Sequence, residues 1–422
     1  MKREFFENEI GESYVKAELS SGLKIYILEK PQYTSSYAIF GTKYGSIDTC
    51  FAVNGEETSV PEGIAHFLEH KLFESEDGDA FSKYAKTGAY ANAFTSFDRT
   101  CYLFSCSDKF YENLDILLSF VQSPYFTEQT VKKEQGIIGQ EIRMYDDSPG
   151  WRVMFNMLLA MYHNHPVRID IAGTVESIAK IDYNLLYKCY NTFYNPSNMF
   201  ICIAGNVETE KVLKHIEEKI LNLEPTHINR IMPEEPKEVV KPFVEQKLAV
   251  AQPIFCFGFK GNAEKTLSVK EKICNALLIE IIAGDASPLY KRLVEKELIN
   301  DEFSSEHFNG FGYSSIIFEG ESNNPQKVAE EIKNEVERLK QEGIDKKLFS
   351  AVRCGMYGNA IRLFNNVESI AMQLVECAMN DSELFDEIKY LKSVKLEDVT
   401  KVLMELDVNK TVLSVINPSQ EV

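Results

Sequence analysis

Apolar residues along the first half of the chain follow two periodicities, one typical of strands and one typical of helices. Strands are expected at "KIYILEK" and "SSYAIFGTKYG", with helices around residues 63–74 and near "AFSKYAKTG". Further strands are expected within 89–106. Helices at about 109–122, 129–145 and 150–162 come next, and a long helix is expected over "VESIAKIDYNLLYKCYNTFY". The strand "NMFICIAGN" and the helix "TEKVLKHIEEKILNL" complete this half.

The second half shows the same order of elements. The strand "PIFCFGFKG" precedes the helices "LSVKEKICNALLIEIIAG" and "SPLYKRLVEKEL", followed by strands within 303–320. Helices at 325–342, 345–378 and 383–405 lead to the closing strand "KTVLSVIN". Strands followed by helices in each half predict two α+β layers that arose by duplication. The Pro- and Glu-rich stretch 224–243 is interpreted as a linker between domains at 1–223 and 244–422.

Candidate chemistry lies in "GIAHFLEHKLFE", residues 63–74, whose residues favour a helix. Positions four apart share a helix face, so His66 and His70 can reach one point, and Glu69 borders that face. This arrangement suits a Zn²⁺ held by two imidazoles, with a carboxylate that takes a proton from water. The alternative is a core helix with hydrogen-bonded histidines. The zinc interpretation is favoured because three polar groups in an apolar segment need partners, which a metal supplies.

A third metal ligand is expected from "TVKKEQGIIGQEIRMYDDSPGW", residues 130–151, which has the apolar pattern of a helix. Glu134 and Glu141 are seven residues apart, about two helical turns, so both carboxylates lie on one face. Spacing alone does not choose between them, and a solvated surface pair is the alternative. The two histidines upstream favour a role for one of these acids as ligand.

These segments resemble the pitrilysin/insulysin family of inverted zinc peptidases, which includes the mitochondrial processing peptidases. The resemblance rests on "HFLEH", "GAYANAFTSFDRTCYLF", "EQGIIGQEI" and "HPVRIDIAGTVESI", which span most of the first half. It implies that His66, His70 and Glu141 bind Zn²⁺ and that Glu69 is the general base. It also implies that Glu134 assists catalysis by orienting a ligand.

The resemblance further implies the fold and the substrate site. Each half would be an antiparallel sheet packed by helices. Two such halves per chain would form half of a clamshell chamber for unfolded peptides. Residues 88–104 suggest a strand near an edge, to which an extended peptide can add. Asn92 would contact the scissile region, and Ala93 would offer its backbone. The small side chains of Ala91 and Ala93 would let the peptide backbone approach. The alternative is an ordinary strand whose asparagine caps a bulge.

One family feature is missing from the second half. Active relatives usually carry an Arg and a Tyr there, which bind the substrate carbonyl. In the matching stretch "LVEKELIND", Val294 and Asp301 occupy these positions, and Arg292 is two residues away. This departure suggests a heterodimer in which a related partner chain supplies the pair. A homodimer is the alternative assembly. A non-catalytic peptide-binding or scaffold subunit is the alternative function.

Composition and net charge limit the partners and the cellular compartment that we expect. The chain has 422 residues and a net charge of −19, which disfavours nucleic acid or an anionic membrane surface as partner. Basic peptides remain compatible with that charge. The first residues carry no apolar secretory signal, and no run of about 18 apolar residues is found. Nine scattered cysteines without a Cys-x-x-Cys pair are typical of reduced core thiols. We therefore expect a soluble cytoplasmic protein.

Overall fold

The computed structural model describes residues 1–76, 78–262 and 266–419. The chain forms two compact units, each assembled from three segments. Unit 1 comprises Met1–Ile142, Asp170–Ile231 and Arg362–Phe385. Unit 2 comprises Arg143–Ile169, Met232–Ile361 and Asp386–Val422.

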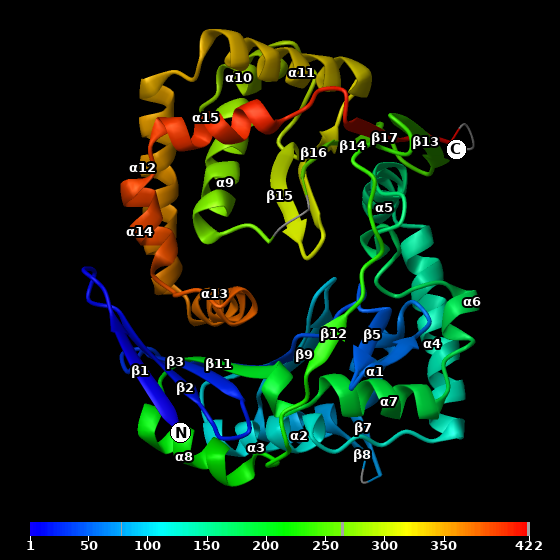
Figure 1. Ribbon diagram of the computed structural model, residues 1–422, viewed down its shortest axis with the longest axis vertical. Helices are drawn as coiled ribbons and strands as arrows, with labels where there is room; N and C mark the ends of the chain where they lie inside the picture. The colour runs from blue at the N-terminus through cyan, green and yellow to red at the C-terminus, as the bar shows by residue number, and fades with distance from the viewer. Residues whose placement is uncertain (77, 263–265, 420–422) are drawn as a thin grey trace. The chain divides into compact units, whose positions relative to one another are not determined.

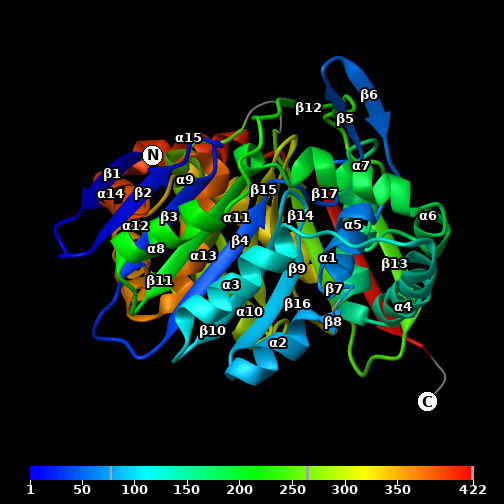
Figure 2. The same ribbon diagram turned by 90° about the horizontal axis from the view of Figure 1, so that it is seen from below.

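Unit 1 is built on a seven-stranded sheet, whose strand order can be followed in Figure 2. In spatial order the strands are β1 (Lys2–Glu7), β2 (Ser13–Glu18), β3 (Lys24–Glu29), β11 (Met199–Gly205), β4 (Ser36–Thr42), β10 (Thr100–Cys106) and β9 (Tyr90–Thr95). Strands β3 and β11 run parallel, whereas the other neighbours are antiparallel. Two small sheets accompany it, formed by β12 (Ile228–Arg230), β5 (Cys50–Val53) and β6 (Glu56–Ser59), and by β7 (Glu74–Ser75) and β8 (Gly78–Asp79).

Helices cover both faces of the unit 1 sheet. The strands β4 and β11 are buried along their whole length, as expected for strands covered on two sides. Helix α13 (Val367–Asn380) packs on β3, β4 and β11, and Figure 1 shows α8, α3 and α2 on the opposite face. The remaining helices of this unit include α1 and most of α4. The bounds are α1 (Ile64–Leu72), α2 (Ala80–Thr87), α3 (Phe110–Val121), α4 (Glu128–Asp146), α6 (Val175–Ile178), α7 (Tyr183–Phe193), α8 (Thr209–Lys219), and the 3-10 turns Pro196–Asn198 and Leu363–Asn365.

Unit 2 is built on a five-stranded sheet. Its spatial order is β13 (Phe243–Leu248), β17 (Thr411–Pro418), β14 (Ile254–Lys260), β16 (Tyr313–Glu321) and β15 (Ser304–Gly310). The helices are α5 (Pro149–Met161), α9 (Val269–Ala283), α10 (Pro288–Glu295), α11 (Pro325–Glu342), α12 (Lys346–Arg362), α14 (Asp386–Ser393), α15 (Leu396–Glu405), with a 3-10 turn at Pro166–Arg168. Side chains alternate along β14, so that Cys256 faces Met157 of α5 and Phe257 faces Lys333 of α11.

The two sheets share one topology. The order β3-β11-β4-β10-β9 in unit 1 matches β13-β17-β14-β16-β15 in unit 2. In each set of five strands, the strand that comes first in the sequence pairs in parallel with the strand that comes last. The other neighbouring pairs are antiparallel. The predicted α+β fold with two homologous halves is therefore confirmed. Each sheet contains this one parallel pair, which the expectation of a purely antiparallel sheet did not include.

The two halves exchange a helix. Helix α5 belongs to the first half of the sequence but packs on β13, β14 and β17 of unit 2. Helix α13 belongs to the second half but packs on the sheet of unit 1. The compact units thus differ from the continuous domains 1–223 and 244–422, because apolar periodicity marks a buried helix face without naming the sheet it covers.

Three predicted helices are interrupted. The stretch 345–378 is divided by the turn Leu363–Asn365, after which the Asn366 side chain caps α13. Similarly, the stretch from 175 to 194 contains α6 and α7, and the Asp182 side chain caps α7. The stretch 383–405 contains α14 and α15. In the first two cases a short polar side chain binds a free backbone N–H, which starts a new helix.

The predicted linker 224–243 is anchored in both units. Within unit 1, β12 pairs with β5, and Arg230 Nε lies 2.7 Å from Asp48 Oδ1. Within unit 2, the Glu235 carboxylate accepts three consecutive backbone N–H groups, those of His163, Asn164 and His165. Lys260 Nζ also donates to Glu235 at 2.7 Å. These contacts make the stretch an ordered part of both units.

One helical stretch, Val269–Glu295, is long and apolar enough to cross a membrane by length and composition alone. More than half of its apolar window is buried inside the protein, and core helices of water-soluble proteins pass the same test. The stretch comprises α9 and α10, both of which belong to unit 2.

Because α13 packs on the sheet of unit 1, a cavity in its buried face should destabilise unit 1 rather than unit 2. Leu374 on α13 is fully buried, so Leu374→Ala is expected to cost about 2–5 kcal/mol. Hydrogen exchange should then rise in β4 and β11 of unit 1. The matched substitution Leu403→Ala on α15, also fully buried, should raise exchange in unit 2 instead. Equal loss of protection in both units after Leu374→Ala would contradict this assignment.

Candidate functional site

Helix α1 carries the candidate site, and its start is fixed by a close backbone contact. Gly63 precedes the helix with a φ of 85°, and a Cβ there would lie 2.3 Å from the Ala172 carbonyl oxygen. Gly173, also at positive φ, would clash with the Glu62 carbonyl at 2.6 Å. Ser177 Oγ donates to that same carbonyl at 2.9 Å. Glycine is needed at both positions, because any side chain would push α1 away from the loop 170–177.

Three potential ligand atoms converge between α1 and α4. His66 Nε2 lies 3.7 Å from Glu141 Oε1, and His70 Nε2 lies 3.4 Å from Glu141 Oε2. The ligand atoms of all three residues lie within 4.8 Å of one another. A tetrahedral zinc site with bonds of about 2.1 Å separates its ligand atoms by about 3.4 Å. The two nitrogens and the carboxylate therefore have the chemistry and spacing that fit a Zn²⁺ ion.

The pKa values of the two imidazoles are shifted in opposite directions. Burial and, to a smaller extent, the nearby His70 lower the pKa of His66 to about 3, so His66 is neutral near pH 7. Burial also acts to lower the pKa of His70, but the Glu134 hydrogen bond and the charges of Glu69 and Glu141 outweigh it and raise the pKa. A neutral His66 is ready to bind a cation, whereas at His70 the raised pKa makes protons stronger competitors of a metal.

Glu134 sets the orientation of His70. Its carboxylate accepts a hydrogen bond from His70 Nδ1 at 3.1 Å, and Glu134 itself is buried. A proton held on Nδ1 leaves the lone pair of Nε2 free and aimed at Glu141. The two acids of α4 thus divide their contacts, with Glu141 facing both imidazole Nε2 atoms and Glu134 behind one ring.

Glu69 stands beside this group, with its carboxylate held by β9. Thr95 Oγ1 donates to Glu69 Oε2 at 2.6 Å. Burial raises the pKa of Glu69 and the charge of Glu141 adds to it, while the Thr95 and His70 interactions offset part of the rise. A half-buried carboxylate with a raised pKa is suited to accept a proton.

The residues predicted to bind substrate lie on an exposed edge. Strand β9 is the last strand of the sheet and pairs with β10 along its other side. Asn92 is exposed, and its Oδ1 accepts the backbone N–H of Ala93 at 2.9 Å. Their role in substrate binding stays a prediction. The backbone N–H of Ala93 is bound to the side chain of the neighbouring Asn92 in this structure.

No cation stands at the position in the second half where the resemblance places an arginine. Val294 on α10 is 45% exposed and replaces the expected arginine. Arg292 Nη2 is bound to Glu335 Oε2 at 2.7 Å, and Glu335 is buried. Because that carboxylate is also held by Arg338, Arg292 is part of a local ion-pair network of unit 2.

Sequence reasoning missed Thr95 and the glycine pair Gly63 and Gly173. Strand alternation places Thr95 on the same face as Ala91 and Ala93, and that face meets α1 through Glu69. A hydroxyl beside small residues was therefore a usable signal for a contact with the helix. The glycines had no such signal, because their requirement arises from a contact distant in sequence.

Comparison with known families agrees with this geometry. The family model described as Insulinase (Peptidase family M16) matches residues 55–175. The model described as Peptidase M16 inactive domain matches residues 180–355. The first match contains His66, Glu69, His70 and Glu141, and the second covers most of the half in which no such motif occurs.

Similar proteins span nearly the whole chain. A Bacillus subtilis protein named uncharacterized zinc protease YmfH is 43% identical over 94% of both chains. The crystal structure of a putative M16-like peptidase from Alicyclobacillus acidocaldarius is 33% identical and superposes with a TM-score of 0.95, covering 98% of this chain and all of that one. Pitrilysin, 16% identical, shares the fold with a TM-score of 0.75, and the match covers 98% of this chain but 46% of pitrilysin.

The glycine contact at the start of α1 predicts a selective defect. Gly63→Ala should destabilise the protein and reduce bound Zn²⁺, because the Cβ collides with Ala172 and shifts the helix. Gly55→Ala is the matched control, since Gly55 has a φ of 84° and open space around it. The control should show only the roughly 1–2 kcal/mol cost of the left-handed conformation. Thermal unfolding and zinc content measure both effects. Equal behaviour of the two variants would refute the helix shift.

The contact behind His70 predicts a second effect. Glu134→Gln should weaken Zn²⁺ binding by about 10–100-fold, as for other groups that orient a metal-binding histidine. In the parent protein the affinity should fall as the pH drops through the raised pKa of His70, because a proton then competes for the ring. In the variant this fall should move to lower pH. Chelator competition across pH measures it, with the exposed Glu128→Gln on α4 as control. An unchanged pH dependence would exclude this role for Glu134.

Proposed function

Because the chain belongs to the M16 (insulinase) family of peptidases, we propose that it is a zinc-dependent endopeptidase acting on unstructured peptides or leader segments. The observation that carries the proposal is the convergence of His66, His70 and Glu141 at distances that fit zinc, beside a half-buried Glu69. The names of the relatives as zinc proteases support the same class of chemistry.

In this proposal the ion is held by His66 and His70 through their Nε2 atoms and by Glu141 through its carboxylate. A zinc ion bound there supplies Lewis-acid polarisation to a water molecule and to a peptide carbonyl. Glu134 keeps the His70 ring in the orientation that presents Nε2.

Glu69 carries the proton transfers. Its carboxylate accepts a proton as water attacks the peptide carbonyl, and it then returns that proton to the leaving amine. The raised pKa of Glu69 favours both steps, because a strongly acidic carboxyl would hold the proton too weakly. The carboxylate is fixed by Thr95, so the acceptor oxygen has a defined direction.

The edge strand β9 supports the choice of an extended peptide as substrate. A peptide strand added to that edge would form main-chain hydrogen bonds, which do not depend on side-chain identity. The exposed Asn92 and the backbone of Ala93 are the groups we assign to this contact. Folded proteins rarely offer a free extended segment, so the edge selects unstructured chains.

We also propose that the active assembly contains a second homologous chain. Support comes from Val294 at the place of the family's arginine, from the engagement of Arg292 with Glu335, and from the match to 46% of pitrilysin. A heterodimer in which the partner supplies an Arg/Tyr pair is favoured, and a homodimer is the alternative. The proposed compartment is the reducing cytoplasm, consistent with nine free cysteines.

The proposed function is tested on the zinc-loaded chain with a pool of unstructured peptides. The parent protein should cleave the pool, and Glu69→Gln should retain zinc but lose nearly all turnover, since the amide cannot accept the proton. Mass spectrometry of the products and metal analysis give the two readouts. Substantial cleavage by Glu69→Gln would reject Glu69 as the base.

The partner proposal is decided by the same assay. Turnover that increases when a zinc-free homologue carrying the Arg/Tyr pair is added supports the heterodimer. Full turnover by the chain alone supports a homodimer. Bound zinc without cleavage under either condition would favour a non-catalytic peptide-binding subunit.

A further inference from the structure

Thr95 holds the Glu69 carboxylate through its hydroxyl, and its backbone also contributes a hydrogen bond. The direction of the hydroxyl hydrogen can be assigned. Thr100 Oγ1 donates its hydrogen to the Tyr44 carbonyl at 2.9 Å. Thr95 Oγ1 lies 3.3 Å from Thr100 Oγ1 and 2.6 Å from Glu69 Oε2. A hydroxyl has one hydrogen, and that of Thr100 is committed to a carbonyl. The hydrogen of Thr95 is therefore the one directed at the Glu69 carboxylate.

This donor distinguishes the two oxygens of Glu69. Hydrogen bonds from a hydroxyl to an ionised carboxylate are strong, and 2.6 Å is within their usual range. The Thr95 hydrogen occupies one of the two lone-pair sites of Oε2 and lowers the basicity of that oxygen. A proton arriving from water therefore binds Oε1 more favourably, and Oε2 continues to accept from Thr95 afterwards.

The position of Thr95 depends on the turn between β9 and β10. Residues 96–99 form this turn, closed by the hydrogen bond from Ser96 N to Arg99 O at 2.8 Å. The turn rests on the loop after β4, where the backbone N–H groups of Ser46 and Ile47 donate to the carbonyls of Ser96 and Phe97. Gly45 permits this approach, because a Cβ there would lie 2.4 Å from the turn.

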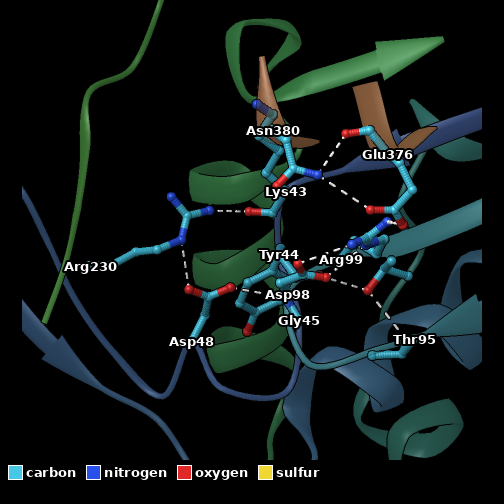
Figure 3. Close-up of polar contacts among 11 residues, drawn as sticks. Lys43, Tyr44, Gly45, Asp48, Thr95, Asp98, Arg99, Arg230, Glu376 and Asn380 are labelled. Carbon is cyan, nitrogen blue, oxygen red and sulfur yellow. Dashed lines mark hydrogen bonds and ion pairs between the residues drawn. The ribbon is translucent and has the colours of Figure 1, made fainter. Parts of the chain in front are cut away.

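Ion pairs fix the turn from the other side. Figure 3 shows the Arg99 guanidinium between Asp98 and Glu376 of α13. Arg99 binds Asp98 through two nitrogens, at 2.7 and 3.1 Å. Asn380 Nδ2 lies 3.3 Å from Glu376 Oε2 and holds that carboxylate in turn. A forked guanidinium pairing of this kind defines geometry as well as charge.

The loop beneath the turn is fixed as well. Asp48 is buried and accepts from Gly45 N at 2.9 Å and from Arg230 Nε at 2.7 Å. Arg230 also donates to the Lys43 carbonyl, as Figure 3 shows. The network therefore joins the β4 loop, the linker strand β12, the β9–β10 turn and α13, all within unit 1.

We propose that Thr95 is a positioning residue for the general base: its hydroxyl holds Glu69 Oε2 and so assigns proton transfer to Oε1. This inference rests on the proposed peptidase function and adds to it the control of the base by β9. The same strand presents the proposed substrate edge, so β9 positions both the general base and the bound peptide.

The test compares Thr95→Val with Thr95→Ser in the zinc-loaded full chain. Valine has nearly the same shape without the hydroxyl, and serine retains the hydroxyl without the methyl group. Thr95→Val should lower kcat by about 10–100-fold with little change in KM, whereas Thr95→Ser should remain within about threefold of the parent. Thr192→Val is the control, because the Thr192 hydroxyl donates to the Lys188 carbonyl on α7.

Crystal structures of the zinc-loaded parent and Thr95→Val give a readout that does not depend on activity. The Glu69 carboxylate should keep one orientation in the parent and turn or lose definition in the variant, with zinc content unchanged. If Glu69 keeps its orientation in Thr95→Val, or if valine and serine lower kcat equally, the positioning role is overturned. A parent that stays inactive even with an added zinc-free homologue carrying the Arg/Tyr pair would refute the peptidase function, while the crystal structures would still decide the role of Thr95.

Discussion

The site depends on where helix α1 begins. His66, Glu69 and His70 all lie on this short helix, so any shift of its axis moves three functional groups together. The backbone of Gly63 and Gly173 meets at distances that exclude a side chain. Ser177 Oγ adds a hydrogen bond to the Glu62 carbonyl, next to Gly63. A contact made by backbone atoms is stiffer than one made by long side chains, which suits a site that must hold ligand atoms in place.

Most polar groups of the site face a partner, whereas His66 Nδ1 is buried without a hydrogen-bond partner among the described residues. Burial of a charge is costly unless a partner is present. Glu134 is paired with His70, Glu69 with Thr95, and Glu141 faces both imidazole Nε2 atoms. The assembly draws on α1, α4 and β9, which are far apart in sequence. A metal ion would complete it by balancing the negative charge gathered at one point.

The part of this site that lies within one helix could be predicted from the sequence. The spacing of His66 and His70 places both rings on one helix face, and the structure brings them together with Glu141. The choice between Glu134 and Glu141 required family resemblance, because tertiary packing decides which acid reaches Nε2. The β5–β6 hairpin was missed although Asn54 and Gly55, both at positive φ, form a recognisable turn pair. The exchange of α5 and α13 left no mark in the apolar pattern, since each helix would look the same on either sheet.

The exchanged helices also set the order in which the protein can be completed during synthesis. The strands of the unit 1 sheet have all emerged by Gly205, but α13, which covers one face, follows only from Val367. Helix α5 emerges early and must wait for the sheet of unit 2, whose strand β17 begins at Thr411. Nascent chains usually fold domain by domain from the N-terminus. Neither core can be completed before α13 and β17 have been synthesised, so a chain that stops before Val367 leaves both cores unfinished.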